Sequence, residues 1–207
     1  MALSANALGA TFILGGPGNI EGGDCAPFGC VMRYQQAYAA SLFTGPITIT
    51  GLTIFNTQYV PEEIDAATYT ITLSTSLNPV GSLSATFAEN TGLDAALFFN
   101  GALSGPASPS FTINGTAFQY NPAAGDLLIE VVKSGTSEAF ALYTDFRDDF
   151  SGFQRVYAYG NDAAGFVEQN YGLVTGFTIA DAPEPSTFGM AGAALAGLIA
   201  LRRRRGK

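Results

Sequence analysis

The segment at residues 47–55, ITITGLTIF, alternates apolar side chains with threonine. Residues 69–74, YTITLS, repeat this alternation. A period of two sends successive side chains to opposite faces of an extended chain, and threonine, isoleucine and tyrosine favour strands. Both segments therefore predict half-buried β-strands with threonine on one face.

More strands are expected on either side of these two, because short apolar runs alternate with turn-forming residues. The runs lie at 83–88, 95–99, 111–113, 117–120, 127–133, 139–143, 153–159 and 173–179, and the turns at 78–79, 90–92, 104–106, 121–122 and 134–135. Only residues 33–42 have helical spacing, and a strand followed by a turn fits them equally. Eight or more short strands predict an all-β body, an antiparallel β-sandwich of the jelly-roll type.

Composition limits what this body can do. The chain has 207 residues, enough for one domain and a short appendage, and it has no histidine, which excludes every mechanism that needs an imidazole. Residues 1–182 carry 16 acidic and 4 basic side chains, a net charge of −12. A surface this acidic repels phosphate backbones, so we expect no nucleic-acid partner. The glycines lie in turns rather than in phosphate-binding loops, and we expect no cofactor.

Two cysteines, Cys25 and Cys30, bracket a Gly- and Pro-rich loop. A zinc site would need two further ligands, and the chain has no histidine and no third cysteine. The four-residue spacing also differs from the C-x-x-C form of redox motifs. We therefore expect a structural disulfide in an oxidising compartment, with free thiols as the alternative if the chain stays reduced.

The C-terminal end of the chain is apolar and then strongly basic. Residues 188–201, FGMAGAALAGLIAL, carry no charge, and Arg202, Arg203, Arg204 and Arg205 follow at once. As a helix, the apolar run spans about 21 Å, and starting it at Pro185 brings it near the lower limit for a membrane span. The arginines act as a stop-transfer signal that keeps residues 202–207 in the cytoplasm. A short transmembrane helix over 188–201 is therefore expected; the alternative is a buried core helix, against which the four arginines argue.

Residues 181–187 form a proline-rich joint before this run, because Pro183 and Pro185 block regular hydrogen bonding around Glu184. The Pro183-Glu184-Pro185 motif, the following Ser186 and Thr187, the apolar run and the arginines together resemble the PEP-CTERM sorting signal of bacterial exported proteins. The body segments 33–38 and 47–52 also resemble segments that recur in those proteins.

This resemblance implies a partner and a route. The partner is an exosortase, a membrane enzyme similar to a cysteine transpeptidase, which removes the hydrophobic tail during export. The route leads through a transient inner-membrane anchor to the cell surface or the extracellular space. The resemblance also implies a Gram-negative host that makes extracellular polysaccharide, which is a further candidate partner. It implies no activity for the body at 8–180.

An exported chain needs an N-terminal signal, and Ala5-Asn6-Ala7 fits the small-residue cleavage site that ends one. No Lys or Arg precedes Arg33, so the basic start of such a signal is missing. We interpret residues 1–7 as the remnant of a signal peptide. An ordinary alanine-rich N-terminus is the alternative.

Candidate chemistry in the body is sparse. Asp145, Asp148 and Asp149 cluster, with Asp162 further on, and carboxylates suit Ca²⁺. The spacing does not match an EF-hand loop and Arg147 offsets part of the charge, so a solvated acidic loop is favoured and no metal is expected. No nucleophile motif is present, and a secreted hydrolase would need a carboxylate-lined cleft. We expect no enzyme activity.

Tyrosines offer a second interpretation, because their amphipathic rings suit stacking on sugars. The candidates are Tyr34, Tyr38, Tyr59, Tyr120, Tyr157, Tyr159 and Tyr171. Most are expected in the core, and the absence of tryptophan weakens a lectin assignment. The sequence thus favours a non-enzymatic exported protein of the cell surface or extracellular matrix, with a carbohydrate-binding or adhesive module as the alternative.

Overall fold

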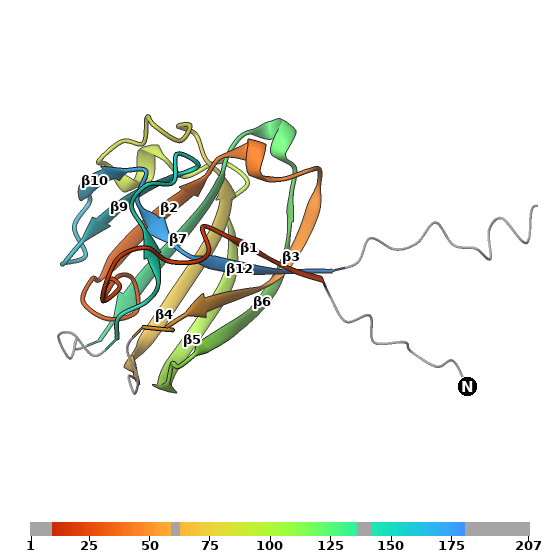
Figure 1. Ribbon diagram of the computed structural model, residues 1–207. Helices are drawn as coiled ribbons and strands as arrows, with labels where there is room; N and C mark the ends of the chain where they lie inside the picture. Colours follow the sequence, from red (N-terminus) through yellow and green to blue (C-terminus); the bar gives the residue numbers. More distant parts are fainter. Residues whose placement is uncertain (1–9, 59–62, 136–141, 181–207) are drawn as a thin grey trace, which may run out of the picture.

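The structure, a computed structural model, describes residues 10–58, 63–135 and 142–180 (Figure 1). Its strands and three short 3₁₀ helices follow one another as β1 (Ala10–Leu14), β2 (Arg33–Tyr38), η1 (Ala40–Leu42), β3 (Ile47–Phe55), β4 (Glu63–Thr75), η2 (Phe87–Glu89), β5 (Ala96–Pro106), β6 (Ser110–Tyr120), η3 (Pro122–Ala124), β7 (Leu127–Ser134), β8 (Phe146–Arg147), β9 (Phe153–Ala158), β10 (Phe166–Gln169), β11 (Gly172–Leu173) and β12 (Thr175–Ala180). The predicted all-β class is confirmed.

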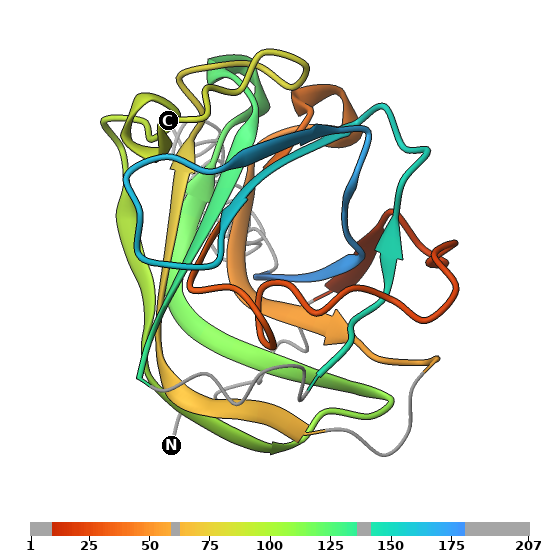
Figure 2. The same ribbon diagram turned by 90° about the vertical axis from the view of Figure 1, so that its left-hand side faces the viewer.

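The strands form two main sheets, and every pair in them is antiparallel. The first has the order β1-β12-β3-β6, and the second has the order β10-β9-β2-β7-β4-β5 (Figures 1 and 2). A small ladder of β8 and β11 lies beside them. Because β1 and β12 are neighbours, Ala10 pairs with Ile179, and the described chain begins and ends at the same side of the first sheet.

Aromatic side chains join the two sheets. The Tyr38 ring on β2 lies 5.3 Å from the Phe177 ring on β12, at nearly a right angle. The Tyr38 hydroxyl also forms a 2.7 Å hydrogen bond with Oγ1 of Thr175 on β12. One hydrophobic cluster takes buried residues from both sheets, so the sheets pack face to face around a common core.

The alternating segment at 47–55 contains an irregularity that its core position requires. The apolar residues before Gly51 are Ile47 and Ile49, at odd positions, whereas the buried apolar residues after it are Leu52 and Ile54, at even positions. Pairing with β6 shifts register between Ile49 and Gly51. This bulge turns Ile49 and Leu52 to the same side, and both are buried. A Cβ on Gly51 would lie 3.1 Å from Thr178 on the neighbouring strand, so little space exists for a larger residue.

Some of the predicted strands and turns differ from those in the structure. The expected strand at 83–88 is wrong, because the chain there forms a loop that leads into η2, and Leu83 and Phe87 belong to a second, smaller core cluster. The expected turn at 104–106 is the end of β5, and the runs at 111–113 and 117–120 are one strand, β6. Residues 33–42 form a strand followed by a 3₁₀ turn, as one of the two interpretations had it.

Other predictions fall on residues that the structure does not describe. These are the signal-peptide remnant at 1–7, Tyr59, most of the expected strand at 139–143, the joint at 181–187, the apolar helix at 188–201 and the basic tail at 202–207.

The expected disulfide is confirmed. Cys25 and Cys30 are bonded, with their Cα atoms 5.3 Å apart. The loop that they close is also fixed by a hydrogen bond from the Gly29 amide to the Cys25 carbonyl, at 2.7 Å. At the entrance to this loop, the Asp24 carboxylate accepts a hydrogen bond from the Ala26 amide. It also forms an ion pair with Arg155 on β9. This loop therefore lies against the second sheet rather than projecting from the body.

The core tyrosines make stability sensitive to alkaline pH. Burial raises the pKa of Tyr38, although its hydrogen bond with Thr175 acts in the opposite direction. A tyrosine whose pKa is raised in the folded state stabilises the fold fully below its unfolded pKa near 10, and this contribution is lost as the pH rises further. The expected slope is about 1.4 kcal/mol per pH unit for each such tyrosine. Urea unfolding between about pH 9.5 and 11.5 should show it.

The matched variant is Tyr38→Phe, which keeps the ring and removes the titrating group. Its free energy of unfolding should fall by about 1 kcal/mol at neutral pH through loss of the hydroxyl contact. Above pH 10 its curve should be flatter than that of the wild type by about 1.4 kcal/mol per pH unit. Parallel curves for the two proteins would contradict the argument.

Candidate functional site

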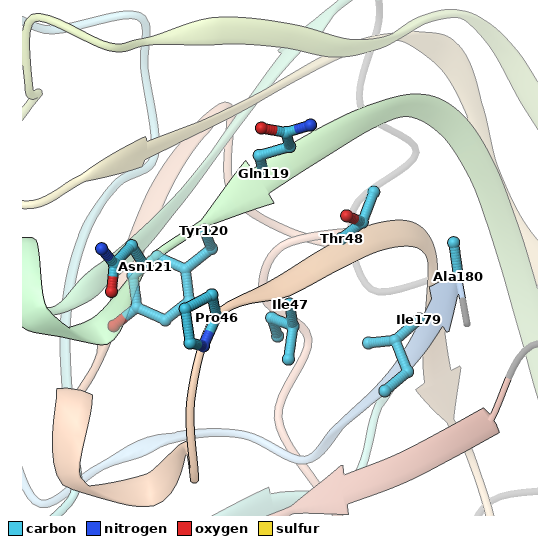
Figure 3. Close-up of a pocket in the computed structure, with 8 residues that line it drawn as sticks. All are labelled: Pro46, Ile47, Thr48, Gln119, Tyr120, Asn121, Ile179 and Ala180. Atoms are coloured by element: carbon cyan, nitrogen blue, oxygen red, sulfur yellow. The ribbon is translucent and has the colours of Figure 1, made fainter. Parts of the chain in front are cut away.

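A groove lies beside Ile179 and Ala180, the last residues of β12. In the sequence, the proline-rich joint begins at the next residue. Ile179 and Ala180 form one wall, and the start of β3 and the end of β6 form the others (Figure 3). The groove encloses about 570 Å³ and is open to solvent. Its full lining is Pro46, Ile47, Thr48, Gln119, Tyr120, Asn121, Ile179 and Ala180.

The groove offers amides, a threonine hydroxyl and apolar surface, and none of its lining side chains is a carboxylate or a base. Figure 3 shows Gln119 and Thr48 on one side of their strands and Ile47 and Ile179 on the other. The Tyr120 hydroxyl already donates a hydrogen bond to the Gly125 carbonyl, at 2.7 Å. This arrangement contains no carboxylate pair of the kind that hydrolysis of a glycosidic bond requires.

Asp145, a weak candidate for calcium binding, is a structural residue. It is buried, so its assignment to a solvated loop is wrong. Its carboxylate accepts hydrogen bonds from the Thr57 amide at 3.0 Å and the Thr57 hydroxyl at 2.7 Å. Its backbone accepts from Val174 and donates to Phe55. Asp145 thus connects the end of β3 with the starts of β8 and β12.

The other two candidates have different partners. Asp148 accepts a hydrogen bond from the Asn19 side chain at 2.8 Å. Asp149 forms an exposed ion pair with Arg147 at 2.8 Å, and that hydrogen bond lowers the pKa of the Asp149 carboxyl. Within residues 10–58, 63–135 and 142–180, no three acidic or cysteine side chains gather into a group that could hold a metal ion. The three aspartates therefore do not converge on one site.

The tyrosine candidates divide into core and surface residues. Tyr34, Tyr38 and Tyr120 are buried. Tyr157 lies on β9 at the margin of the core, and Tyr159 follows β9 and is 60% exposed. Phe166, which the sequence interpretation did not include, is 61% exposed on β10. Tyr157, Tyr159 and Phe166 contact one another, and we refer to these three residues as the aromatic corner.

The aromatic corner follows from strand register. Phe166 is the direct cross-strand partner of Tyr157 in the β9–β10 pair, so their rings share one face. Their centroids are 5.7 Å apart and the ring planes differ by 37°. The Tyr159 ring stands at 89° to Tyr157 and at 64° to Phe166. Tyr157 and Phe166 thus form a tilted floor, and Tyr159 forms a wall.

A buried arginine supports this floor. Arg155 precedes Tyr157 by two residues on the same face of β9, and its side chain is only 4% exposed. Its guanidinium carbon lies 3.9 Å from the Tyr171 ring centroid and 4.7 Å from that of Tyr157. It forms ion pairs with Asp24 at 2.9 Å and with Glu168, the cross-strand partner, at 2.6 Å. These contacts fix the ring of Tyr157 from below.

The charged and aromatic side chains around Arg155 shift the pKa values of Arg155 and Tyr157. Burial would lower the pKa of Arg155, but Tyr34, Asp24 and Glu168 outweigh it and the pKa is raised. Burial, followed by the Glu168 carboxylate, raises the pKa of Tyr157. Nη1 of Arg155 is buried without a hydrogen-bond partner in the described part of the chain. The guanidinium therefore stays charged and is covered by rings, so a ligand on the surface does not reach it.

The loop between β9 and β10 is fixed at its base. Gly165 donates to the Ala85 carbonyl at 2.9 Å, and Phe87 donates to the Ala163 carbonyl at 3.1 Å. A Cβ on Gly165 would overlap the backbone of Tyr157, so glycine permits the close approach of β10 to β9. This packing holds Phe166 opposite Tyr157.

All basic side chains in the described ranges are paired with carboxylates. Besides the Arg155 pairs, Arg33 contacts Glu130 at 2.7 Å, Lys133 contacts Asp65 at 2.7 Å, and Arg147 contacts Asp149. The positive charges of the body are therefore neutralised within the fold. An anionic ligand would meet a surface with a strong excess of carboxylates.

Comparison with known proteins identifies the C-terminal segment. The model for the PEP-CTERM protein-sorting motif matches residues 181–205, which include Pro183, Glu184, Pro185 and the four arginines. No curated protein and no solved structure matches the chain. Over the described residues, no helix has the length and apolar character to cross a membrane. The chain carries a PEP-CTERM protein-sorting motif, which implies export and sorting by an exosortase.

Proposed function

We propose that this protein is an exported, non-enzymatic component of the cell surface or extracellular matrix. An exosortase would recognise Pro183-Glu184-Pro185 while residues 188–201 anchor the chain transiently in the inner membrane, and the body would then be released. The observation that carries this proposal is the match of the sorting motif to residues 181–205. The motif begins at residue 181, directly after β12 ends at Ala180, so no element of the described fold lies between the body and the motif.

We propose further that the body is a jelly-roll sandwich. Without β8 to β11, the remaining eight strands lie in the orders β1-β12-β3-β6 and β2-β7-β4-β5. Apart from β4 and β5, neighbouring strands come from separate parts of the chain. This interleaving is the result of two Greek-key connections. The segment from β8 to β11 then acts as an insertion that extends the second sheet with β9 and β10 and supplies the aromatic corner.

A second candidate function is the binding of extracellular polysaccharide. The specific observation in its favour is the aromatic corner, in which two exposed rings adjoin a third on an edge of the second sheet. Exposed aromatic side chains in contact with one another are a common property of binding surfaces. The groove beside Ala180 is lined by no carboxylate, so it lacks the residues that hydrolysis of a glycosidic bond would need there.

Fractionation of the native host tests the export proposal. Antibodies against the body should detect it in the surface or extracellular fraction, and mass spectrometry of that form should show that residues of the apolar tail have been removed. In a host that lacks its exosortase gene, the full-length chain should accumulate in the inner-membrane fraction. Release of a trimmed body at the normal rate from the deletion strain would refute the proposal.

A further inference from the structure

We propose that the aromatic corner binds a single chain of soluble, neutral polysaccharide. This inference deepens the second candidate function above and rests on it. The corner is the place in the described body where exposed aromatic rings meet, because Tyr159 and Phe166 are the two aromatic side chains among its large exposed hydrophobic residues. Their exposure costs hydration free energy that a bound ligand would recover.

Ring chemistry selects a sugar. A pyranose presents C–H groups on its flat faces and hydroxyl groups around its edge, so it stacks on an aromatic face while its edge forms hydrogen bonds. The corner provides both kinds of partner. The rings of Tyr159 and Phe166 are exposed, and the Glu168 carboxylate, 37% exposed, lies 3.4 Å from the Tyr157 hydroxyl. An acceptor at the margin of an apolar surface would orient a ligand rich in hydroxyl groups.

Ring geometry selects a single chain over a crystalline surface. A flat solid requires coplanar rings, but Tyr159 stands nearly perpendicular to Tyr157. Successive sugars in a free chain rotate relative to one another, so two of them can contact a floor and a wall. The tilt of 37° within the floor suits the same twisted ligand.

Charge selects a neutral polymer. The cation nearest to the corner, Arg155, is buried and paired with Asp24 and Glu168, so it offers no site to an acidic sugar. The other basic residues of the described body are also paired. Residues 1–182 have a net charge of −12, which would repel an anionic chain.

The position of the corner fits this role. β9 and β10 lie on the opposite side of the body from the point where β12 ends (Figure 1), and Figure 2 views the body from their side. While the body is still tethered through residue 181, before its release, the corner would therefore lie away from the point of attachment.

Affinity electrophoresis of the full chain tests the proposal, in a polyoxyethylene detergent that carries no sugar headgroup. The probes are hydroxyethyl cellulose, galactomannan and dextran as soluble neutral polymers, with alginate as the anionic polymer. At least one neutral probe should retard the wild type. Tyr159→Ala and Phe166→Ala should each weaken retardation by about tenfold, and the double variant should abolish it.

The matched control is Leu97→Ala on β5, the opposite edge strand, where Leu97 is 52% exposed. It removes comparable exposed apolar surface and should bind as the wild type does. Tyr159→Phe should retain most of the binding, because it keeps the ring. All variants change exposed residues and should unfold at nearly the wild-type urea concentration.

Three results would overturn the inference: no retardation by any neutral probe, undiminished retardation of the double variant, or stronger retardation by alginate. If the protein sedimented with microcrystalline cellulose but was not retarded by the soluble polymers, binding to a single chain would be refuted. Failure here is distinguishable from failure of the export proposal. A wild type that is exported and trimmed but not retarded refutes only the corner, and a retarded chain that stays untrimmed refutes only the sorting route.

Discussion

Replacing Lys133 with methionine should lower the free energy of unfolding by about 3–5 kcal/mol, a large share of the ~5–15 kcal/mol that stabilises a typical domain. The side chains of Lys133 and Asp65 are both fully buried, with Nζ 2.7 Å from Oδ2. Two charges removed from water are tolerated only while each compensates the other. Methionine preserves the length of the side chain and removes its charge, so the Asp65 carboxylate would lose its ion-pair partner inside the core.

Lys133 also connects three parts of the fold. Its ammonium group donates to the carbonyl of Gly29, which lies within the disulfide loop between Cys25 and Cys30, and its backbone amide donates to the Met32 carbonyl at 2.8 Å. Asp65 lies on β4 and Lys133 on β7, so the ion pair links neighbouring strands of the second sheet to that loop. Loss of the ammonium group should therefore loosen the loop as well as the sheet.

Urea unfolding followed by far-UV circular dichroism measures this effect. The matched control is Arg147→Met, which breaks the exposed ion pair with Asp149 and should cost less than about 1 kcal/mol. The double variant Lys133→Met with Asp65→Asn removes both charges and should recover part of the loss. Equal destabilisation by Lys133→Met and Arg147→Met would contradict the assigned role of the buried pair.

Strand positions were predictable where burial on one face imposed a period of two. The segments at 47–55, 69–74, 127–133 and 153–159 all lie within strands or extend one by a single residue. The expected strand at 83–88 failed because its apolar residues serve a loop, and Leu83 and Phe87 fill a small cluster that has no strand periodicity. The boundary at 104–106 also failed, because Ser-Gly-Pro is typical of a turn but here forms the end of β5, where Gly105 has a φ of +96°.

The candidate sites were less accessible to sequence reasoning because they depend on register. Period two places Lys133 on the face of Leu127, Ile129 and Val131, but its partner Asp65 lies 68 residues away and no local pattern links the two. β10 has four residues, too few for a recognisable pattern, and Phe166 meets Tyr157 only through the pairing of β9 and β10. Asp145 was misjudged because its burial depends on Thr57, a contact across 88 residues.

The sorting motif, in contrast, is local and therefore readable from sequence alone, and its replacement should have the largest effect on function. Changing Pro183, Glu184 and Pro185 to alanine would leave the apolar residues 188–201 and the four arginines unchanged, so the anchor should persist. Each arginine would cost about 2.5–3.5 kcal/mol at the bilayer centre, which opposes passage through the membrane.

In this alanine variant the exosortase would lose Pro183 and Pro185, which are expected to keep the recognition motif extended, whereas an alanine sequence permits a helix there. Processing should stop, and immunoblots of fractionated native host should show the full-length chain in the inner membrane and almost none outside. Changing Arg202–Arg205 to serine is the informative comparison, since it keeps the recognition motif and should weaken retention, releasing unprocessed chain. The two variants thus separate recognition from anchoring, and normal trimming and release of the alanine variant would show that Pro183-Glu184-Pro185 does not direct sorting.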